Sequence, residues 1–187
     1  MKNKQILLTS RPAGMPTTDN FSIVDADVPE PREGEVLLRT LFLSVDPYMR
    51  GRMRDQKSYA KPFALNEVIY GGVVAEVVES RSPALQPGNT VTGMLGWRLY
   101  SVARADEVRK IDPNLAPVST ALGVLGMPGL TAYFGLLDIG QPQAGETVVV
   151  SRRGRGRRND RVPDCEDQGV PGCRYCGQRG EEPISGE

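Results

Sequence analysis

The large apolar residues of this 187-residue chain stop abruptly after Ser151. The last 36 residues (187 − 151 = 36) hold only three members of the Val, Ile, Leu, Met and Phe group: Val162, Val170 and Ile184. A segment of this kind cannot bury enough apolar surface to offset the entropy that it loses on ordering. We therefore predict that residues 152–187 are disordered and that the preceding residues hold the core.

The part before this tail has the pattern of a β-rich domain, in which short apolar runs alternate with turn residues. Pro29-Glu30-Pro31 and Pro87-Gly88-Asn89 are examples of such turns. The paired Gly71 and Gly72 predict a bend or bulge, and bent strands at this spacing favour a small closed β-barrel. The predicted strands are Gln5–Ser10, Phe21–Ala26, Gly34–Val45, Val68–Glu79, Asn89–Ala103 and Val108–Ile111.

The pattern then changes to helix and to a different kind of strand. Leu115–Leu137 is rich in Ala, Leu and Gly. Because Pro128 cannot lie deep inside a helix, we predict a break over residues 126–129 and a second helix over about 130–137. The β-branched run Thr147–Ser151 is typical of a strand buried on both faces of a parallel sheet. A helix followed by such a strand is how an α/β nucleotide-binding domain begins.

Composition excludes several classes of function. The chain has no histidine, which removes Ser-His-Asp and Cys-His catalysis. Its 23 basic and 23 acidic side chains balance, which argues against a general polyanion binder. No apolar run approaches the roughly 20 residues of a membrane span, and the start MKNKQILL lacks the apolar region of a signal peptide. We therefore predict a cytoplasmic protein without a membrane partner.

Three motifs carry a resemblance to a known family. They span Ser44–Met53 (SVDPYMRGRM), Tyr70–Val73 (YGGV) and Gly126–Tyr133 (GMPGLTAY). With them, the chain resembles the zinc-free, NADPH-dependent branch of the medium-chain dehydrogenase/reductase superfamily, which contains 2-alkenal, leukotriene B4 and prostaglandin reductases. The resemblance implies a mainly β fold: a GroES-like β-barrel domain over residues 1–125, followed by the first helix and strand of an incomplete α/β Rossmann domain over residues 126–151.

The resemblance also implies site residues. Tyr48 would line the substrate cleft, where its phenol could bond a carbonyl or pack against an alkenyl chain; a tyrosine that only packs in the barrel is an equal alternative. Met127 and Thr131 would bind the cofactor near its nicotinamide ring, the alternative being helix-terminus packing and a helix-capping hydroxyl. No catalytic residue and no metal ligand is assigned. Trp97 and Tyr100 are interpreted as barrel packing. Three arginines are interpreted as solvated or salt-bridged: Arg50, Arg52 and Arg54.

After Ser151 the chain departs from this family, because Arg-Arg-Gly-Arg-Gly-Arg-Arg stands where a glycine-rich phosphate-binding turn is expected. Translating the tail back into degenerate codons and reading one base later permits GAAGAVG, followed by MTVCQIAKIKGCRVVGIAGSGEKNRYLE. This string reads as the family's Rossmann fingerprint, the rest of its first helix, a second strand and a Gly-Ser-Gly turn. We therefore hypothesise that a single-base frame change near codon 152 produced residues 152–187.

Two other interpretations of the tail are weaker. Cys173 and Cys176 have the spacing of a zinc half-site, with Cys165 as a third ligand, but a fourth soft ligand is lacking. Arg152–Arg158 is similar to a basic run that binds RNA or phosphate, but nearby acidic side chains weaken its field. Because the frame change accounts for both features, neither a metal nor a nucleic acid is expected.

The family's reaction is hydride transfer from NADPH to the β-carbon of an α,β-unsaturated aldehyde or ketone. Because most of the Rossmann domain is missing, we expect this chain to be inactive and not to bind NADPH. The alternatives are a non-catalytic GroES-like binding or interaction module, and a nucleic-acid binder that uses the Arg-rich tail. An enone or alkenal is the expected partner of the intact family. A family-type dimer is not expected here, whereas non-specific self-association is.

Overall fold

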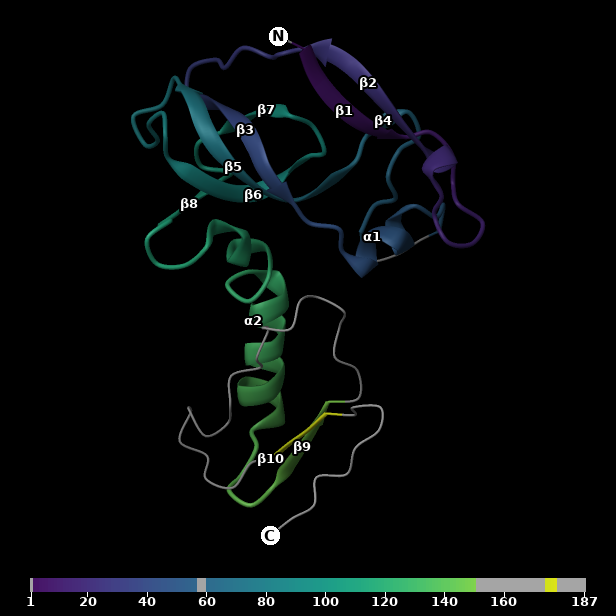
Figure 1. Ribbon diagram of the computed structural model, residues 1–187, viewed down its shortest axis with the longest axis vertical. Coiled ribbons are helices and arrows are strands. Elements are labelled where there is room, and N and C mark those ends of the chain that lie inside the picture. Colours follow the sequence, from purple (N-terminus) through teal and green to yellow (C-terminus); the bar gives the residue numbers. More distant parts are fainter. Residues whose placement is uncertain (1, 57–59, 151–173, 178–187) are drawn as a thin grey trace. The chain divides into compact units, whose positions relative to one another are not determined.

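The structure, a computed structural model, describes residues 2–56, 60–150 and 174–177. The chain divides into two compact units, residues 1–122 and 123–187. Unit 1 is built mainly from strands, with one short α-helix, α1 (Pro47–Arg52), and two 3-10 turns (Figure 1). The mainly β fold that the sequence predicts is therefore confirmed.

The first sheet of unit 1 has three antiparallel strands in the order β2-β1-β4. They are β2 (Phe21–Asp27), β1 (Lys2–Leu8) and β4 (Glu67–Val68). The 3-10 turn η1 (Thr18–Asn20) leads directly into β2. The β2 edge carries Asp25 and Asp27, and Lys2 and Lys4 of β1 approach Asp25 at 3.9 and 3.4 Å. Charged side chains of this kind discourage pairing with a further strand.

The second sheet has five antiparallel strands in the order β7-β3-β5-β6-β8. Its register shifts twice between β3 and β5, within Leu37–Phe42, and such irregularities bend a strand. Of the predicted bend or bulge at Gly71 and Gly72, the bulge is wrong, because β5 pairs with β6 through both glycines without a shift. The strands are β3 (Glu35–Leu43), β5 (Tyr70–Ser80), β6 (Thr90–Gly96), β7 (Tyr100–Arg104) and β8 (Arg109–Ile111).

The strand predicted over Asn89–Ala103 is two strands, β6 and β7, separated by a turn. The Arg98 amide donates to the Gly96 carbonyl at 2.8 Å, which reverses the chain. A Cβ at Gly96 would lie 2.7 Å from Arg98 Nε and 2.9 Å from Val68 Cγ1, so glycine leaves the room that this turn needs. The sequence pattern is continuous across the turn because Trp97 is itself buried.

The two sheets are joined along β1 by hydrogen bonds. The side chain of Asn3 acts as a backbone substitute: its Nδ2 donates to the Tyr100 carbonyl and its Oδ1 accepts from the Tyr100 amide, both at 2.9 Å. Backbone bonds continue the join, from the Ile6 amide to the Trp97 carbonyl and from the Leu99 amide to the Lys4 carbonyl. Asn3 is completely buried, so these partners replace the water that it loses.

The core of unit 1 consists of two clusters of buried apolar side chains. The first cluster lies on the five-stranded sheet, and its members are Val36, Leu38, Val73, Ala75, Val77, Leu85, Val91, Leu95, Ala103 and Val108. The second cluster packs α1 against the strands, and its members are Leu8, Met49, Met53, Phe63, Ile69 and Trp97. Unit 1 therefore buries its own core, as a domain must.

Unit 2 contains a helix followed by a parallel strand pair. The helix α2 (Met127–Tyr133) continues as one π-helical stretch, η3 (Phe134–Gly140). A break separates two helical segments as predicted, but it lies over residues 123–126, between η2 (Val118–Leu122) and α2, and not over 126–129. Pro128 lies in the first turn of α2, where a missing N–H costs nothing. The strand β9 (Thr147–Val150) agrees with the predicted strand, and it pairs in parallel with β10 (Arg174–Gly177).

Strand β10 was not expected, because it lies in the segment predicted to be disordered. It also gives β9 a parallel neighbour, which the sequence pattern did not predict. The remainder of residues 152–187, including the basic run Arg152–Arg158 and two of the three cysteines, lies outside the described residues. In the part of the chain that the structure describes, no helix is long and apolar enough to cross a membrane.

Candidate functional site

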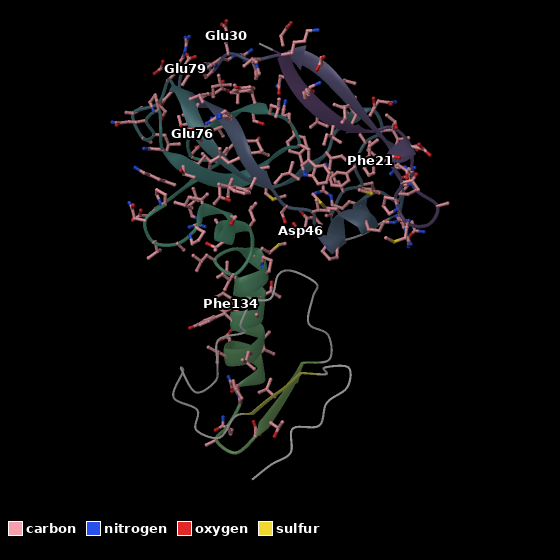
Figure 2. The ribbon with its side chains drawn as sticks, in the orientation of Figure 1. Phe21, Glu30, Asp46, Glu76, Glu79 and Phe134 are labelled. Carbon is pink, nitrogen blue, oxygen red and sulfur yellow. The ribbon has the colours of Figure 1, made fainter. Side chains whose placement is uncertain are left out.

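Tyr48 lies on α1, whose start is tied to the five-stranded sheet. The Ser44 amide donates to the Gly72 carbonyl at 2.8 Å, which carries the chain from β3 across to β5. The Ser44 hydroxyl then donates to Asp46 Oδ1 at 2.9 Å, and Asp46 caps the helix, which begins at Pro47. Figure 2 shows Asp46 beside this first turn. The motif Ser44–Tyr48 therefore fixes the backbone position from which the Tyr48 side chain extends.

The next residue, Met49, anchors the helix in the second core cluster. Its side chain is 1% exposed, and its sulfur accepts the Asp46 amide at 3.5 Å. A Cβ at Gly71 would overlap the Met49 Cε methyl and lie 3.0 Å from Trp97 Nε1. The glycine is required here for close approach of the helix and not for a bulge. The adjacent Tyr48 is half-buried and packs against the same cluster, as Ile6 and Phe21 also do.

The arginines of this motif bind backbone carbonyls. Arg50 donates to the carbonyls of Pro12 and Gly14 at 2.6–3.0 Å, and Arg52 donates to the Lys61 carbonyl at 2.9 Å. The Arg52 guanidinium also lies 4.1 Å from the centre of the Phe63 ring. The interpretation of these two side chains as solvated or salt-bridged is therefore corrected: they fasten neighbouring loops to α1. Trp97, 8% exposed in the second cluster, agrees with its predicted packing role.

Met127 and Thr131 lie on α2 in unit 2. Met127 begins the helix and is 56% exposed, and Thr131 lies one turn later and is also exposed. The Thr131 hydroxyl donates to the Met127 carbonyl at 2.8 Å, so its oxygen is left to accept a hydrogen bond. A Cβ at Gly129 would overlap the Val124 carbonyl, which explains the glycine in this motif. The Gly129 amide donates to the Gly123 carbonyl at 3.1 Å.

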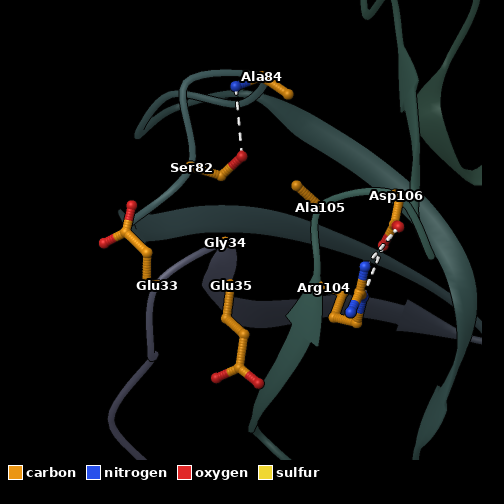
Figure 3. Close-up of a pocket in the computed structure, with 8 residues that line it drawn as sticks. All are labelled: Glu33, Gly34, Glu35, Ser82, Ala84, Arg104, Ala105 and Asp106. Carbon is orange, nitrogen blue, oxygen red and sulfur yellow. Dashed lines mark hydrogen bonds and ion pairs between the residues drawn. The ribbon is translucent and has the colours of Figure 1, made fainter.

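A separate depression of about 420 Å³ lies at the start of β3, the end opposite to the chain that leads into α1 (Figure 3). Its rim is charged, and Arg104 donates to both carboxylate oxygens of Asp106 at 2.9 and 3.0 Å. These bonds hold the pKa of the Asp106 carboxyl below its ordinary value. The Asp106 side chain is exposed, so the pair is a solvated contact. The lining residues are Glu33, Gly34, Glu35, Ser82, Ala84, Arg104, Ala105 and Asp106.

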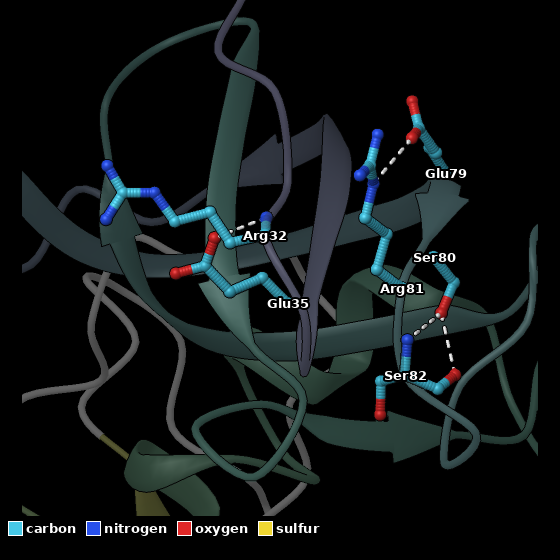
Figure 4. A network of polar contacts seen from close by, with 6 residues as sticks. All are labelled: Arg32, Glu35, Glu79, Ser80, Arg81 and Ser82. Carbon is cyan, nitrogen blue, oxygen red and sulfur yellow. Dashed lines mark hydrogen bonds and ion pairs between the residues drawn. The ribbon is translucent and has the colours of Figure 1, made fainter.

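The loops around this depression are held by local polar contacts (Figure 4). The Arg32 amide donates to Glu35 Oε2 at 2.8 Å, and Arg81 Nε lies 3.4 Å from Glu79 Oε1. The Ser80 hydroxyl bonds the carbonyls of Ser82 and Leu85 at 2.9 and 2.7 Å. Because these contacts close turns, we interpret the polar side chains at this end of unit 1 as stabilising its loops. Among the described residues, no group of three or more Cys, Asp or Glu side chains is placed to hold a metal ion.

Comparison with known proteins gives consistent matches. The family described as the N-terminal domain of oxidoreductase matches residues 4–111. The chain is 51% identical over 150 residues to the NADPH-dependent curcumin reductase of Escherichia coli (strain K12), which covers 80% of this chain and 44% of that protein. It is 41% identical over 157 residues to the 2-alkenal reductase (NADP(+)-dependent) of Nicotiana tabacum, covering 81% and 46%.

A solved structure gives the same result. The crystal structure of CurA in complex with NADPH from Vibrio vulnificus matches with a TM-score of 0.81 and 44% identity, covering 92% of this chain and 50% of that one. The chain therefore spans about half the length of the relatives that it matches. The matched half contains the α1 motif, which lies within residues 4–111.

Proposed function

Because the chain belongs to the family of the N-terminal domain of oxidoreductase, in the NADPH-dependent alkenal-reductase branch of the medium-chain dehydrogenase/reductases, we propose that it is the barrel half of a C=C reductase. The substrates of that reductase are α,β-unsaturated aldehydes or ketones. The observation that carries the proposal is the 51% identity to an NADPH-dependent curcumin reductase. The resemblance to this branch and the fold class that the sequence predicts are confirmed.

Tyr48 is the substrate-binding residue of this proposal. Tyr48 is half-buried and packs on the second core cluster, and a tyrosine side chain combines an apolar ring with a polar hydroxyl. An enone has the same division, with a carbonyl at one end and an apolar chain at the other. The inward anchor at Met49 and the Ser44–Asp46 contact support this role, because they hold the tyrosine on a fixed helix.

Met127 and Thr131 are the cofactor-binding residues of this proposal. A nicotinamide ring has an apolar face and a carboxamide whose NH₂ group donates. The exposed Met127 side chain suits the ring face, and the free acceptor capacity of the Thr131 oxygen suits the carboxamide. When bound, NADPH supplies the hydride, and the protein supplies orientation.

The described residues do not fit the phosphates of this cofactor. A pyrophosphate is held by free N–H groups at a helix N-terminus, reached through glycines. In α2, Pro128 lacks an N–H, and the amides of Gly129 and Leu130 already donate to the carbonyls of Gly123 and Gly126. We therefore infer that the described residues, 2–56, 60–150 and 174–177, do not hold NADPH by themselves and support no turnover. Loss of proximity and orientation alone removes roughly 7–11 kcal/mol of barrier lowering.

The second candidate function is a non-catalytic binding module, and the two complete core clusters of unit 1 favour it. A unit that buries its own core can fold and present α1 without the rest of a reductase. The zero net charge of the chain does not favour a nucleic-acid function. We propose the cytoplasm as its compartment, because residues 1–164 hold no cysteine for a disulfide.

A chimera tests the reductase proposal. Residues 1–150 are joined to the remaining C-terminal part of the Escherichia coli curcumin reductase, and NADPH consumption is followed with an α,β-unsaturated ketone. We expect enone-dependent consumption that falls with Tyr48→Ala and persists with the control Arg54→Ala. A chimera that folds and binds NADPH but reduces no enone would contradict the proposal. Equal activity of the Tyr48→Ala and Arg54→Ala chimeras would contradict the role of the tyrosine.

A further inference from the structure

The chain departs from nucleotide-binding chemistry at the end of β9. This strand follows the α2 helix and has a parallel neighbour, which is the setting in which α/β proteins place a phosphate-binding turn. Such a turn needs glycines, so that the backbone approaches the phosphates closely. The seven residues after Ser151 are instead five arginines and two glycines. Strand β9 is therefore followed by a sequence that does not have the glycines of a phosphate-binding turn.

We propose that the DNA encoding residues 152–187 carries, one base later, the turn, helix and second strand of a site for a 2′-phosphorylated dinucleotide. The later frame then encodes the elements that follow a strand such as β9 in an α/β nucleotide-binding domain. This inference rests on the proposed function, but its first test is independent of any activity. It also predicts which bases the arginine codons contain, because the same bases must serve both readings.

The later reading has the physical signals of the expected elements in the expected order. The shifted string GAAGAVG places glycines at three positions with equal spacing, directly after the β9 segment. The next residues, MTVCQIAKIKG, carry apolar side chains at helical spacing and end on glycine. A β-branched strand, CRVVGIAG, follows. A segment with no history as part of a domain would not be expected to carry these signals in this order in its second frame.

The ligand class follows from the end of that second strand. A carboxylate at this point bonds the ribose 2′-hydroxyl of an unphosphorylated dinucleotide, whereas a cationic side chain accommodates a 2′-phosphate. The shifted string continues as Gly-Ser-Gly-Glu-Lys, in which a hydroxyl and an ammonium group are available near the strand end. The Lys favours the phosphorylated cofactor. This choice agrees with the NADPH dependence in the names of the relatives.

The proposal fixes the codons of five arginines. Each shifted codon consists of the last two bases of one codon and the first base of the next. A glycine in the shifted frame therefore requires CGG or AGG for Arg152, Arg155 and Arg158. The shifted alanine and valine require CGC for Arg153 and CGT for Arg157. Unbiased codon choice would satisfy all five conditions only rarely.

The first experiment is to sequence the DNA from codon 145 to codon 187. We expect the five codons above and an uninterrupted shifted frame through codon 187. An arginine codon that does not end in GG at position 152, 155 or 158 would overturn the inference. That outcome would leave the proposed function standing, because the chimera tests it separately.

The second experiment deletes one base of codon 152 and expresses the restored frame to its own stop codon. We expect saturable enhancement of NADPH fluorescence, with at least tenfold weaker binding of NADH. A matched control first recodes Arg152, Arg155 and Arg158 as CGT, which leaves the 187-residue chain unchanged but puts valine in place of the shifted glycines. We expect the control to lose NADPH binding after the same deletion. A restored product that prefers NADH, or a control that binds equally well, would overturn the assigned site.

Discussion

Replacing Gly71 with alanine tests how α1 is held. The new methyl group would overlap Met49 Cε and lie 3.0 Å from Trp97 Nε1. Met49 is 1% exposed, so its side chain has no path to solvent and must displace its neighbours. Inserting a methyl group into a packed core costs about 1–3 kcal/mol. Alanine recovers about 0.4–1 kcal/mol by restricting the unfolded chain. We therefore expect Gly71→Ala to lower the free energy of unfolding by about 1–2 kcal/mol.

The assay is urea unfolding followed by the fluorescence of Trp97, the only tryptophan in the chain. Gly51→Ala is the matched control, because Gly51 lies in α1, the helix that carries Met49, and a Cβ there meets nothing within 4 Å. We expect this control to be neutral or to stabilise unit 1 by up to about 1 kcal/mol through helix propensity. Equal unfolding midpoints for Gly71→Ala and the wild type, or an equal loss for Gly51→Ala, would refute the close-approach argument.

A double-mutant cycle separates this contact from other effects of the methyl group. Met49→Ala alone removes a buried side chain and should cost about 2–5 kcal/mol. In the double variant the methyl group introduced by Gly71→Ala occupies part of the space that Met49 leaves, so the two losses should not add. We expect a favourable coupling energy above about 0.5 kcal/mol. Additive losses would show that the methyl group and the Met49 side chain do not compete for the same space.

Three further changes probe the rest of unit 1. Replacing the buried Asn3 with alanine removes two hydrogen bonds to the backbone N–H and carbonyl of Tyr100 and should cost about 1–3 kcal/mol in urea unfolding, whereas Asn114→Ala at an exposed position should cost almost nothing. Arg50→Lys cannot hold two carbonyls in one plane, so limited proteolysis should cut residues 11–17 faster than in Arg54→Lys; equal rates would contradict the clamp. The lowered pKa of Asp106 means that its contribution is present above the ordinary carboxyl value of 3.8 and is lost as the pH falls through the lowered pKa. The stability difference between wild type and Asp106→Asn should therefore shrink as the pH falls below the ordinary carboxyl value, and a constant difference would contradict this.

The strands of unit 1 could be predicted because their apolar alternation and their turn residues agree. The uses of individual glycines could not. Gly71 and Gly72 predict a bulge from sequence, yet they leave room for side chains that come from α1 and η2 (Val118–Leu122). A glycine pair indicates that a Cβ would not fit, but the side chains that leave no room for it belong to residues more than 20 positions away in the sequence. Pro128 is a similar case: it indicates that a helix is interrupted nearby, but not whether the proline lies in the interruption or in the first turn of the next helix.

The candidate site was predictable only as far as its motifs. The resemblance singles out Tyr48, Met127 and Thr131, and the structure places the first on a capped helix and the other two on a helix start. The clamp by Arg50 was missed, because a side chain that bonds carbonyls of another loop has no local signal. The substitute backbone made by Asn3 was missed for the same reason, since its partner is 97 residues away. The available hint in the sequence was an asparagine between two lysines at the start of an apolar strand.

The most direct test of the account is NADPH titration and enone-dependent NADPH consumption with the purified 187-residue chain. We predict no saturable change in NADPH fluorescence and no NADPH consumption above the rate without protein, because the described residues supply no phosphate-binding turn. The chimera with the Escherichia coli curcumin reductase serves as the positive control in the same assay. Saturable NADPH binding by the 187-residue chain, with consumption that falls when Met127 and Thr131 are replaced by alanine, would contradict the central claim.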